Sequence, residues 1–364
     1  MNEIKKNVTV VIDGQAGSCG KGKICAYLSL KNNYNIATNN WASNAGHTYV
    51  SDENRKIVVS HLPIALVNKK CKLVLNAGSI ITPEILFSEI DKYSDLIGDR
   101  KIYIHPRAMI IEEKHRETEK NLIKSGSTFK GCGASLADKI MRSSDVILAR
   151  PYFENIDHKY KDKIVITDTA KMLNQEPGEI LIEGSQGADL DINYGLDYPY
   201  VTSRMTSAAQ LIADAGLSPF KVKDIIMIIR PYPIRISNQT NIGKEIYSGD
   251  YAGSKEITWD VVRRRCHCNT DLVEMTTVTK QVRRVFEMNW DRLKYNCMIN
   301  HPTQIVLNFA EYIDWSCYQE KDSTKLPKSV LDFIKKVEEQ TGIPVTMIGT
   351  GAKNSEIIDL RGEK

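Results

Sequence analysis

A glycine- and lysine-rich stretch near the start of the chain has the composition of a phosphate-binding loop. It runs from Gly14 to Lys23 as GQAGSCGKGK and follows the β-branched run Val8–Ile12, which predicts a buried strand. Backbone N–H groups of such a turn, together with the N-terminus of the following helix, form an anion site. The end of the stretch matches the first part of a Walker A loop, but Ile24 stands where Ser or Thr would bind Mg²⁺. The stretch therefore predicts a phosphate cradle that differs from an ordinary P-loop.

A second stretch, Asn44-Ala45-Gly46-His47-Thr48, contains a histidine that could act on a transferring group. Near neutral pH an imidazole can donate a proton or a hydrogen bond to an oxygen atom. A lone histidine is more often a core residue whose hydrogen bonds are satisfied. The position of His47 within this motif favours a functional role.

The elements that must position these residues form a repeating pattern of apolar runs and helical segments. The runs lie at 8–12, 72–76, 101–104, 146–148, 180–183, 224–229, 304–308 and 344–348, and an amphipathic helix is predicted over 329–341 with Ser329 as its N-cap. This order predicts an α/β protein with a mainly parallel central sheet flanked by helices. There is no internal repeat and no Pro-, Gly- or Ser-rich linker. We therefore expect one large domain over residues 1–364, with loop excursions such as 238–256.

Composition and charge exclude several classes of protein. The 49 Lys and Arg exceed the 45 Asp and Glu by only four, which is too weak an excess to predict a nucleic-acid or membrane surface. No apolar run approaches the roughly 20 residues that span a bilayer, and the polar start predicts no secretory signal. The eight cysteines form no CxxC pair, and the Cys266-His267-Cys268 cluster is too close for a usual zinc site. We expect a cytoplasmic protein with reduced thiols.

Five sequence blocks, in order along the chain, resemble the adenylosuccinate synthetase superfamily. The loop is similar to that family's Gly-Asp-Glu-Gly-Lys-Gly-Lys, and residues 44–48 match its Asn-Ala-Gly-His-Thr. Further similar blocks lie at 127–142, at 183–203 and at 349–351, where Gly-Thr-Gly resembles the nucleotide-base loop. The resemblance implies the family's α/β fold with a P-loop-like phosphate loop. It also implies a Mg²⁺-dependent ligase that joins L-aspartate to the 6-position of a purine nucleotide at the expense of a nucleoside triphosphate.

The resemblance also implies site residues, matched position by position. The catalytic residues would be Ser18, Lys21 and His47, and the Gly46 carbonyl would bind Mg²⁺. The triphosphate would contact Gly17, Cys19, Gly20, Lys21, Gly22, Lys23, Thr48, Glu311, Gly349, Thr350 and Gly351. The nucleoside monophosphate would contact Ser18, Asn44, Ala45, Ser127, Thr128, Lys130, Arg142, Gln186, Leu190 and Thr202. By family analogy Arg142 reaches the site of a neighbouring subunit, which implies a homodimer.

Aspartate capture requires arginines, because a guanidinium can bind a carboxylate through two hydrogen bonds. Thr258 followed by Arg263, Arg264 and Arg265 resembles the family's Thr-Thr-Gly-Arg-Arg-Arg-Arg loop, although Trp259-Asp260-Val261-Val262 intervenes. A basic helix end that faces water is the alternative interpretation.

Two departures from the family pattern bear on the substrates. Ser18 replaces the family's catalytic aspartate, as in the phage branch of 2-amino-2′-deoxyadenylosuccinate synthetases, which use dGMP for diaminopurine DNA. The stretch 276–285 is also similar to that branch. Residues Leu307 to Glu311 lack the lysine of the family's guanine-reading Leu-Thr-Lys-x-Asp segment, which favours ATP or dATP as the donor. The prediction is a ligase for dGMP, L-aspartate and ATP.

Two other functions remain open from the residues alone. An ordinary adenylosuccinate synthetase would use IMP and GTP, and Ser18 argues against it. A nucleotide-binding module without turnover would bind dGMP and ATP but release no phosphate with aspartate. A P-loop kinase is disfavoured by Ile24 and by the lack of a second kinase motif.

Overall fold

The computed structural model describes residues 4–122, 127–155, 159–241, 244–276 and 281–362. Its helices are α1 (Lys21–Lys31), α2 (Pro83–Lys92), α3 (Ser94–Ile97), α4 (Glu113–Leu122), α5 (Cys132–Met141), α6 (Ala149–Asn155), α7 (Thr169–Gln175), α8 (Ala208–Asp214), α9 (Trp259–Arg265), α10 (Trp290–Asn300) and α11 (Lys328–Thr341). No helix in this described part of the chain is long and apolar enough to cross a membrane.

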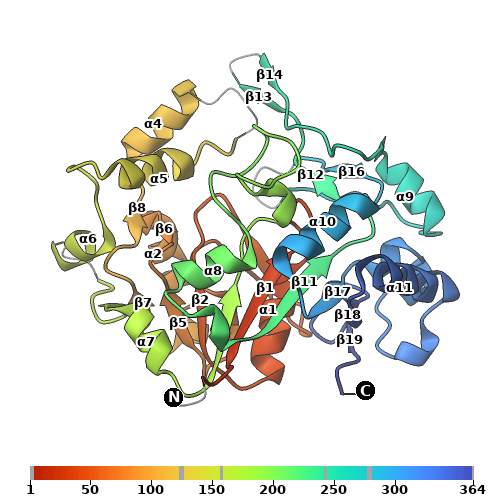
Figure 1. Cartoon of the computed structure of the whole chain (residues 1–364), viewed down its shortest axis with the longest axis horizontal. Coiled ribbons are helices and arrows are strands. Elements are labelled where there is room, and N and C mark those ends of the chain that lie inside the picture. Colours follow the sequence, from red (N-terminus) through yellow and green to blue (C-terminus); the bar gives the residue numbers. More distant parts are fainter. Residues whose placement is uncertain (1–3, 123–126, 156–158, 242–243, 277–280, 363–364) are drawn as a thin grey trace.

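One sheet of ten strands runs through the molecule (Figure 1). In spatial order its strands are β19 (Ile357–Asp359), β18 (Val345–Gly349), β17 (Gln304–Leu307), β11 (Val222–Ile229), β1 (Val8–Asp13), β10 (Glu179–Glu183), β2 (Tyr34–Asn39), β5 (Lys72–Leu75), β7 (Ile102–Ile104) and β9 (Ile164–Ile166). Every neighbouring pair is parallel except β18 and β19. The prediction of a mainly parallel α/β sheet is confirmed.

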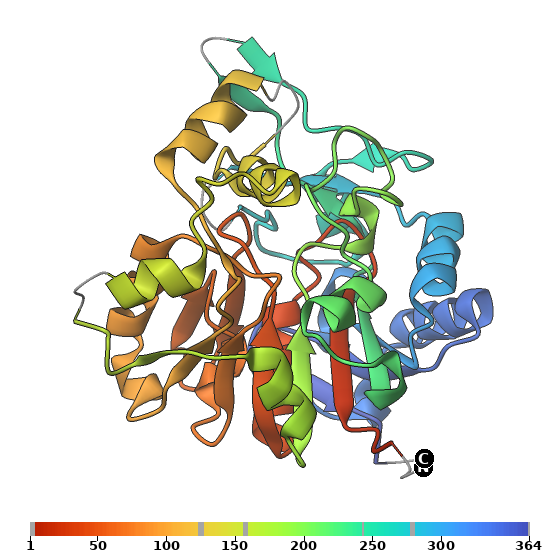
Figure 2. The same cartoon turned by 60° about the vertical axis from the view of Figure 1, so that its left-hand side comes forward.

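Four smaller sheets of two or three strands accompany the central sheet in the described residues. They are β3 (His47–Val50) with β4 (Lys56–Val59), β6 (Ile80–Ile81) with β8 (Met109–Ile110), β13 (Gln239–Asn241) with β14 (Lys244–Ile246), and β16 (Arg284–Phe286) between β12 (Ile234–Arg235) and β15 (Glu256–Ile257). Helices α4 and α5 and the β13–β14 hairpin project beyond the carboxyl ends of the sheet strands, at the top of Figure 2.

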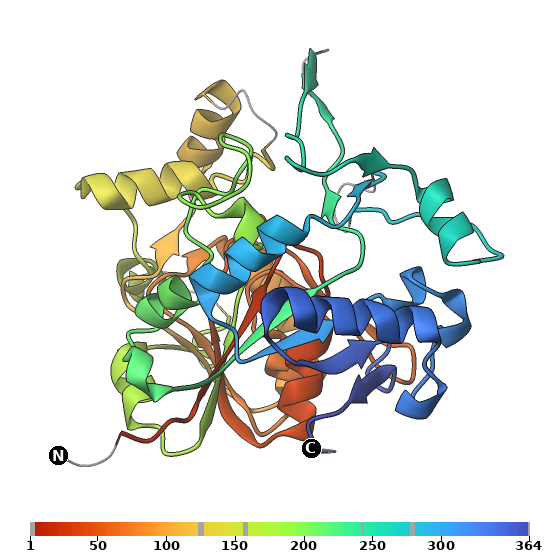
Figure 3. The ribbon, with the colours of Figure 1, turned by 45° about the vertical axis from the view of Figure 1, so that its right-hand side comes forward.

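Two apolar cores cover the two faces of the sheet, because side chains alternate along each strand. Val11 of β1 belongs to the core that includes residues of α1, α2, α3 and α6, whereas Val8 and Val10 belong to the core that includes residues of α7, α8, α10 and α11. Figure 3 shows α10 and α11 over the β17–β18 end of the sheet. Most side chains in the middle of the central strands are apolar, and buried polar ones such as Asp13, Asn39 and Glu183 stand where β1, β2 and β10 end.

Two local predictions were wrong. Residues 146–148 form no sheet strand, and only Leu148 makes an isolated bridge, to Met109. The N-cap of α11 is Pro327 and not Ser329, whose hydroxyl instead donates to Asp314 at 2.8 Å. A short apolar run can lie in a loop when its neighbours cover it, and periodicity alone cannot detect this.

Candidate active site

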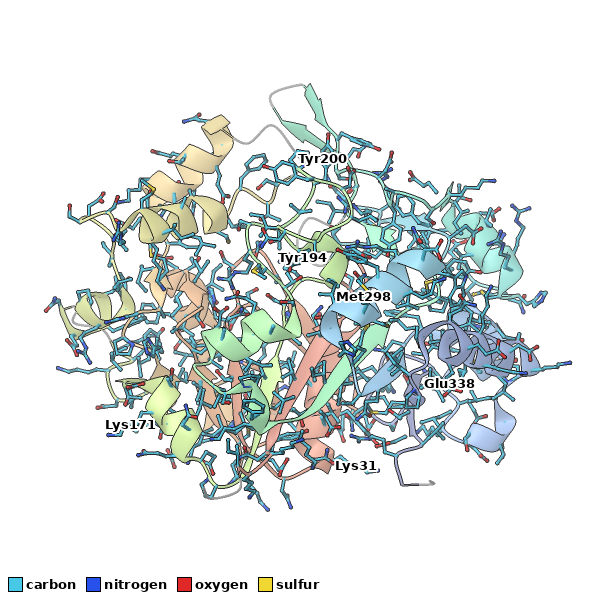
Figure 4. The ribbon with its side chains drawn as sticks, in the orientation of Figure 1. Lys31, Lys171, Tyr194, Tyr200, Met298 and Glu338 are labelled. Carbon is cyan, nitrogen blue, oxygen red and sulfur yellow. The ribbon has the colours of Figure 1, made fainter. Side chains whose placement is uncertain are left out.

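A cleft of about 780 Å³ lies outside the carboxyl ends of the central strands. Its walls come from the segments that follow β1, β2, β10, β11, β17 and β18, together with residues between 272 and 276 and with Gln281 and Arg283. Ligands of open α/β sheets bind at this edge, where successive connections leave in opposite directions. In Figure 4, Lys31 at the end of α1 lies at the bottom of the view, and Tyr200 lies near the top, on the side of the carboxyl ends of the central strands.

Glycines in the loop between β1 and α1 allow its tight turns and leave part of its backbone open to a ligand. Gly17, Ser18 and Gly20 all have positive φ angles, of 88°, 57° and 89°. A side chain at Gly22 would meet the Thr48 carbonyl at 2.6 Å, so glycine there lets α1 approach β3 closely. The helix thus begins at the edge of the cleft with its first N–H groups directed to it, which suits an anion.

A buried carboxylate, Asp13, lies beneath this loop. Its oxygens accept hydrogen bonds from the N–H groups of Gln15 at 3.0 Å, Gly17 at 3.3 Å and Cys19 at 3.1 Å, and from the Cys19 thiol at 3.1 Å. Lys21 Nζ lies 3.1 Å from Asp13 Oδ2 and also donates to the Gln186 carbonyl. The N–H groups of Gly17 and Cys19 are therefore directed inward. The loop groups left to receive a phosphate are the Lys21 ammonium, the first turn of α1, and the N–H groups of Ser18 and Gly20, which bond to no described residue.

Cys19 was expected to contact the triphosphate, but its side chain points away from the cleft. Its side chain is fully buried and does not line the cleft. Burial and the neighbouring Asp13 carboxylate raise the pKa of the Cys19 thiol well above its ordinary value, so the thiol is a neutral donor to Asp13. Cys19 supports the loop from below.

His47 reaches the cleft from the start of β3, close to the charged end of Lys21. Burial, with a smaller contribution from the Lys21 charge, lowers the pKa of His47 well below its ordinary 6.5. No hydrogen bond joins its ring nitrogens to the described residues, so it is not a core histidine with satisfied hydrogen bonds. The ring is neutral at pH 7, so it can donate one N–H hydrogen bond to a ligand but does not act as a protonated general acid.

Lys23 points to the other end of the cleft. Its ammonium donates to the carbonyls of Gly351 at 2.6 Å and Glu356 at 2.9 Å. Glu311 is also buried there, and its Oε2 has no hydrogen-bond partner among the described residues. Burial raises the pKa of Glu311 and lowers that of Lys23, while their mutual attraction opposes both shifts. An unpartnered buried acceptor in a cleft wall is suited to an N–H donor from a ligand.

An ion pair that the sequence did not predict forms the back of the cleft. Arg230, which is fully buried, forms a bidentate pair with Glu274, donates to the Ser18 carbonyl at 3.2 Å and lies 4.2 Å from the Phe309 ring centroid. Burial alone would raise the pKa of Glu274, but Arg230 and Arg283 lower it below its ordinary value. Arg230 directly follows β11, and its role becomes visible only in the fold, where it contacts the loop at Ser18 and the segment at Glu274.

The structure brings most of the expected nucleotide-binding residues to one cleft. Those that line it are Gly17, Ser18, Gly20, Lys21, Gly22, Lys23, Asn44, Ala45, Gly46, His47, Thr48, Thr128, Lys130, Gln186, Leu190, Glu311 and Gly351. Phe309, Tyr312, Trp315 and Tyr318, which were not expected as site residues, add aromatic surface at the Glu311 end. Their spacing resembles that of core residues, so the sequence carried no clear signal for them.

Five other expected residues lie outside the cleft walls. Gly349 and Thr350 lie behind Gly351, and the Thr350 hydroxyl donates to the Glu320 carbonyl at 2.6 Å. Ser127 Oγ accepts from the Phe129 N–H at 3.2 Å, and the Thr202 N–H donates to the Leu190 carbonyl at 2.7 Å. Arg142 ends α5 in an exposed position.

The residues expected to bind aspartate are not brought to the cleft. Arg263, Arg264 and Arg265 end α9, with side chains that are 37%, 66% and 48% exposed and paired with Asp260 or Glu287. Figure 3 places α9 at the outer margin of the molecule. Thr258 is the N-cap of this helix and accepts from the Val261 N–H. This is the arrangement of a basic helix end that faces water.

A different basic segment does reach the cleft. Thr276, Gln281 and Arg283 line it, and Arg283 lies 3.8 Å from Glu274. These residues belong to the stretch 276–285, in which residues 277–280 lie outside the described part of the chain. The run of three consecutive arginines at 263–265 was the stronger sequence signal, but these arginines do not line the cleft.

The family model for adenylosuccinate synthetase matches residues 10–149 and 147–315. The chain belongs to the adenylosuccinate synthetase family. Adenylosuccinate synthetases are ligases that form a C–N bond between a nucleotide and aspartate, with a nucleotide co-substrate and Mg²⁺.

Individual relatives of this synthetase-family chain are similar over nearly its whole length. Adenylosuccinate synthetase of Pyrococcus horikoshii is 32% identical over 97% of this chain and 98% of its own. The adenylosuccinate synthetase of Methanococcus maripaludis is 34% identical over 98% of this chain and 99% of its own. Among solved structures, the succinoaminodeoxyadenylate synthetase (PurZ) of cyanophage S-2L, bound to dGMP and to dATP as an energy donor, has a TM-score of 0.83, 28% identity and coverage of 98% of this chain and 96% of its own. Fully ligated adenylosuccinate synthetase from Plasmodium falciparum has a TM-score of 0.78 and 21% identity, and the match covers 97% of this chain and 99% of its own.

The residues of this synthetase-family site fit a Mg²⁺ ion held mainly by phosphate. No cluster of three or more His, Cys, Asp or Glu that could hold a metal occurs in the described ranges. Gly46 lines the cleft, is exposed and has a carbonyl that accepts no hydrogen bond from the residues described. Mg²⁺ commonly keeps several waters and binds through substrate phosphates with few protein ligands. A single carbonyl is compatible with that mode.

Replacing Asp13 by Ala should destabilise the protein strongly. Lys21 would lose its carboxylate partner while its ammonium stays buried, which costs about 3–5 kcal/mol in the free energy of unfolding. Urea denaturation measures this, and Asp95→Ala, which breaks the exposed pair with Arg55, should change stability much less. Equal stability of the two variants would contradict the role of Asp13.

Replacing His47 by Asn should change how stability depends on pH. Because the pKa of His47 is lowered on folding, the unfolded chain binds a proton near pH 6.5 that the folded chain refuses, so wild type loses stability as the pH falls below 6.5. Relative to His47→Asn, this loss should approach about 1.4 kcal/mol per pH unit. Urea denaturation from pH 7.5 to 5 measures it. His61→Asn should behave similarly, because burial lowers the pKa of His61 to about 3. A constant difference between wild type and His47→Asn would show that the imidazole protonates freely.

Proposed function

We propose that this chain condenses L-aspartate with dGMP, using ATP or dATP and Mg²⁺, to give 2-amino-2′-deoxyadenylosuccinate, a nucleoside diphosphate and phosphate. The observation that carries the proposal is a neutral serine, Ser18, on the cleft wall where the family's loop has its catalytic aspartate. The similarity to the S-2L enzyme, whose structure holds dGMP and dATP, supports it.

The chemistry requires activation of the purine oxygen, because oxide is too poor a leaving group to be displaced by an amine. In the first step the γ-phosphoryl group passes to O6 of the purine, and N1 loses its proton. In the second step the aspartate amine attacks C6, the C6–O bond breaks and phosphate leaves. Mg²⁺ would neutralise charge on the phosphates. Lys21 would hold the transferring group, and the neutral His47 would donate its N–H to the bridging oxygen.

Ser18 would set the preference for a 2-aminopurine. An aspartate in this place adds a negative charge and takes up room beside N1 and C2. A serine hydroxyl is smaller, and it can accept a hydrogen bond from N1–H or from the 2-amino group. The backbone of Ser18 is held by Arg230 at its carbonyl, so the position of the hydroxyl is defined before the purine binds. The N1 proton would leave with help from a substrate carboxylate or phosphate.

The donor triphosphate would occupy the end of the cleft between Lys23 and the aromatic residues. Glu311 offers an unpartnered acceptor to a base N–H there, and Phe309 stands where the family segment has lysine. The monophosphate would contact Thr128, Lys130 and Gln186.

Aspartate would bind near Arg283, which lines the cleft, and not at Arg263–Arg265. We also propose a cytoplasmic homodimer, in which the exposed Arg142 would reach the partner's nucleotide. Exposed Ile140 and Met141 beside it, 68% and 75% accessible, would be covered by such a contact.

The alternative is an ordinary adenylosuccinate synthetase that uses IMP and GTP. It is favoured by the archaeal relatives, which carry that name at 31–34% identity. A module that binds nucleotides without turnover is the third candidate.

A substrate matrix distinguishes the three candidates. Purified protein is incubated with aspartate, Mg²⁺, each of dGMP, GMP, IMP and dIMP, and each of ATP, dATP and GTP, and the products are identified by mass. We expect the succino-adduct from dGMP with ATP or dATP. Faster turnover of IMP with GTP would identify the ordinary enzyme. Stabilisation by dGMP and ATP without phosphate release would identify a binding module.

Ser18→Asp should shift the preference away from dGMP. The added carboxylate would occupy the space of the 2-amino group and lower turnover of dGMP about tenfold or more, equivalent to about 1.4 kcal/mol in the barrier. Ser18→Ala, which removes the hydroxyl without adding charge, is the matched control and should retain the preference for dGMP over IMP. Improved dGMP turnover in Ser18→Asp would count against the proposal.

A further inference from the structure

The His47 ring lies flat against a second, wholly buried ring. The centroids of Trp41 and His47 are 3.7 Å apart, and the two planes differ by only 15°. Trp41 is fully buried and is not among the residues that line the cleft. It therefore cannot act on a ligand directly, and any effect on turnover must pass through a neighbour.

The indole itself is anchored to the central sheet. Its Nε1–H donates to the Glu183 carbonyl, at the end of β10, at 2.7 Å. Its backbone is held as well, because its carbonyl accepts from the Ile80 N–H at 3.0 Å. The Glu183 carboxylate in turn accepts from the N–H groups of Ile64 and Ala65, at 2.9 and 3.0 Å. The indole is thus tied to β10 through its Nε1–H, its backbone is tied to β6, and Glu183 is itself held in place.

His47 has no equivalent anchor of its own. A functional histidine usually has one ring nitrogen fixed by a carboxylate or carbonyl, which leaves the other directed at the ligand. Here no described residue bonds to either nitrogen. The contact that restricts rotation of the imidazole is the face of the indole, because turning the ring out of this plane would require it to leave the stack.

We propose that Trp41 is a positioning residue, which sets the plane of the His47 imidazole so that one ring N–H faces the transferring phosphoryl group. Stacking replaces the usual hydrogen bond to the second nitrogen. The inference rests on the proposed function, because it assumes that His47 contacts the transferring oxygen. It adds a residue outside the cleft to the determinants of turnover.

A double-mutant cycle tests the proposal. Trp41→Leu should lower kcat about 10- to 100-fold, the usual effect of a small misplacement of a reacting group. The KM values for both nucleotides should change less than threefold, since Trp41 lines neither subsite. In a His47→Asn background, Trp41→Leu should lower kcat no further, because the residue through which it acts is gone. The assay uses whichever nucleotide pair the substrate matrix identifies.

Two further variants separate positioning from folding. Tyr34→Leu removes another buried aromatic ring from the opposite end of β2, and it should lower the thermal midpoint without lowering kcat in the folded protein. Trp41→Phe keeps a ring but loses the bond to Glu183, so its kcat should lie between wild type and Trp41→Leu. If Trp41→Leu does not fold, the cycle is run with Trp41→Phe.

A measurement without turnover tests the stack itself. In the NMR spectrum of histidine-labelled protein, the ring protons of His47 are assigned from their loss in His47→Asn. They should be shifted upfield by the indole ring current, and they should lose that shift in Trp41→Leu. Unshifted protons in wild type would overturn the proposal, as would kcat losses that multiply in the double variant. If instead His47→Asn retains full turnover, the proposed role of His47 itself fails.

Discussion

The site depends on one buried carboxylate placed where a positively charged loop must turn. Asp13 ends the central strand β1 and receives three loop N–H groups, a thiol and the Lys21 ammonium. Without this charge, the inward-facing N–H groups and the buried ammonium would repel one another and lack hydrogen-bond partners. The loop therefore has a defined shape before any ligand binds, and Lys21, the N–H groups of Ser18 and Gly20, and the first turn of α1 remain for phosphate.

Around that loop the parallel sheet gathers residues from distant parts of the sequence. Consecutive carbonyls of the loop are held from elsewhere: Ser18 by Arg230 after β11, and Cys19 by Asn308 after β17, at 3.2 and 2.7 Å. Because parallel strands end at the same edge, each contributes its following residues to one cleft. The Arg230–Glu274 pair then couples the loop to the segment that leads to Arg283.

The phosphate loop of this chain has Ser18 where the family's loop has an aspartate, so the loop itself brings no carboxylate to the cleft wall. Among the described lining residues the carboxylates are Glu274 and Glu311, and Glu274 is already paired with Arg230. Ser18 contributes a hydroxyl to the cleft wall and its carbonyl is held by Arg230, while His47, which lines the same cleft, is a neutral imidazole. Such a surface can accept hydrogen bonds from a purine edge without imposing a negative charge on it.

The sequence by itself determined the fold class, the phosphate loop and the histidine beside it, because β-branched runs, glycine spacing and contiguous motifs are local patterns. It did not identify Asp13 as the base of the loop, Trp41 behind His47 or Arg230 behind Ser18, since each acts through partners that are remote along the chain. It also directed attention to Arg263–Arg265, because a run of arginines is conspicuous in sequence whether or not it lines the cleft, and it could not place Arg283 in the cleft wall. Only the tertiary structure decides which side of an element faces the ligand, since that depends on which elements cover the other side.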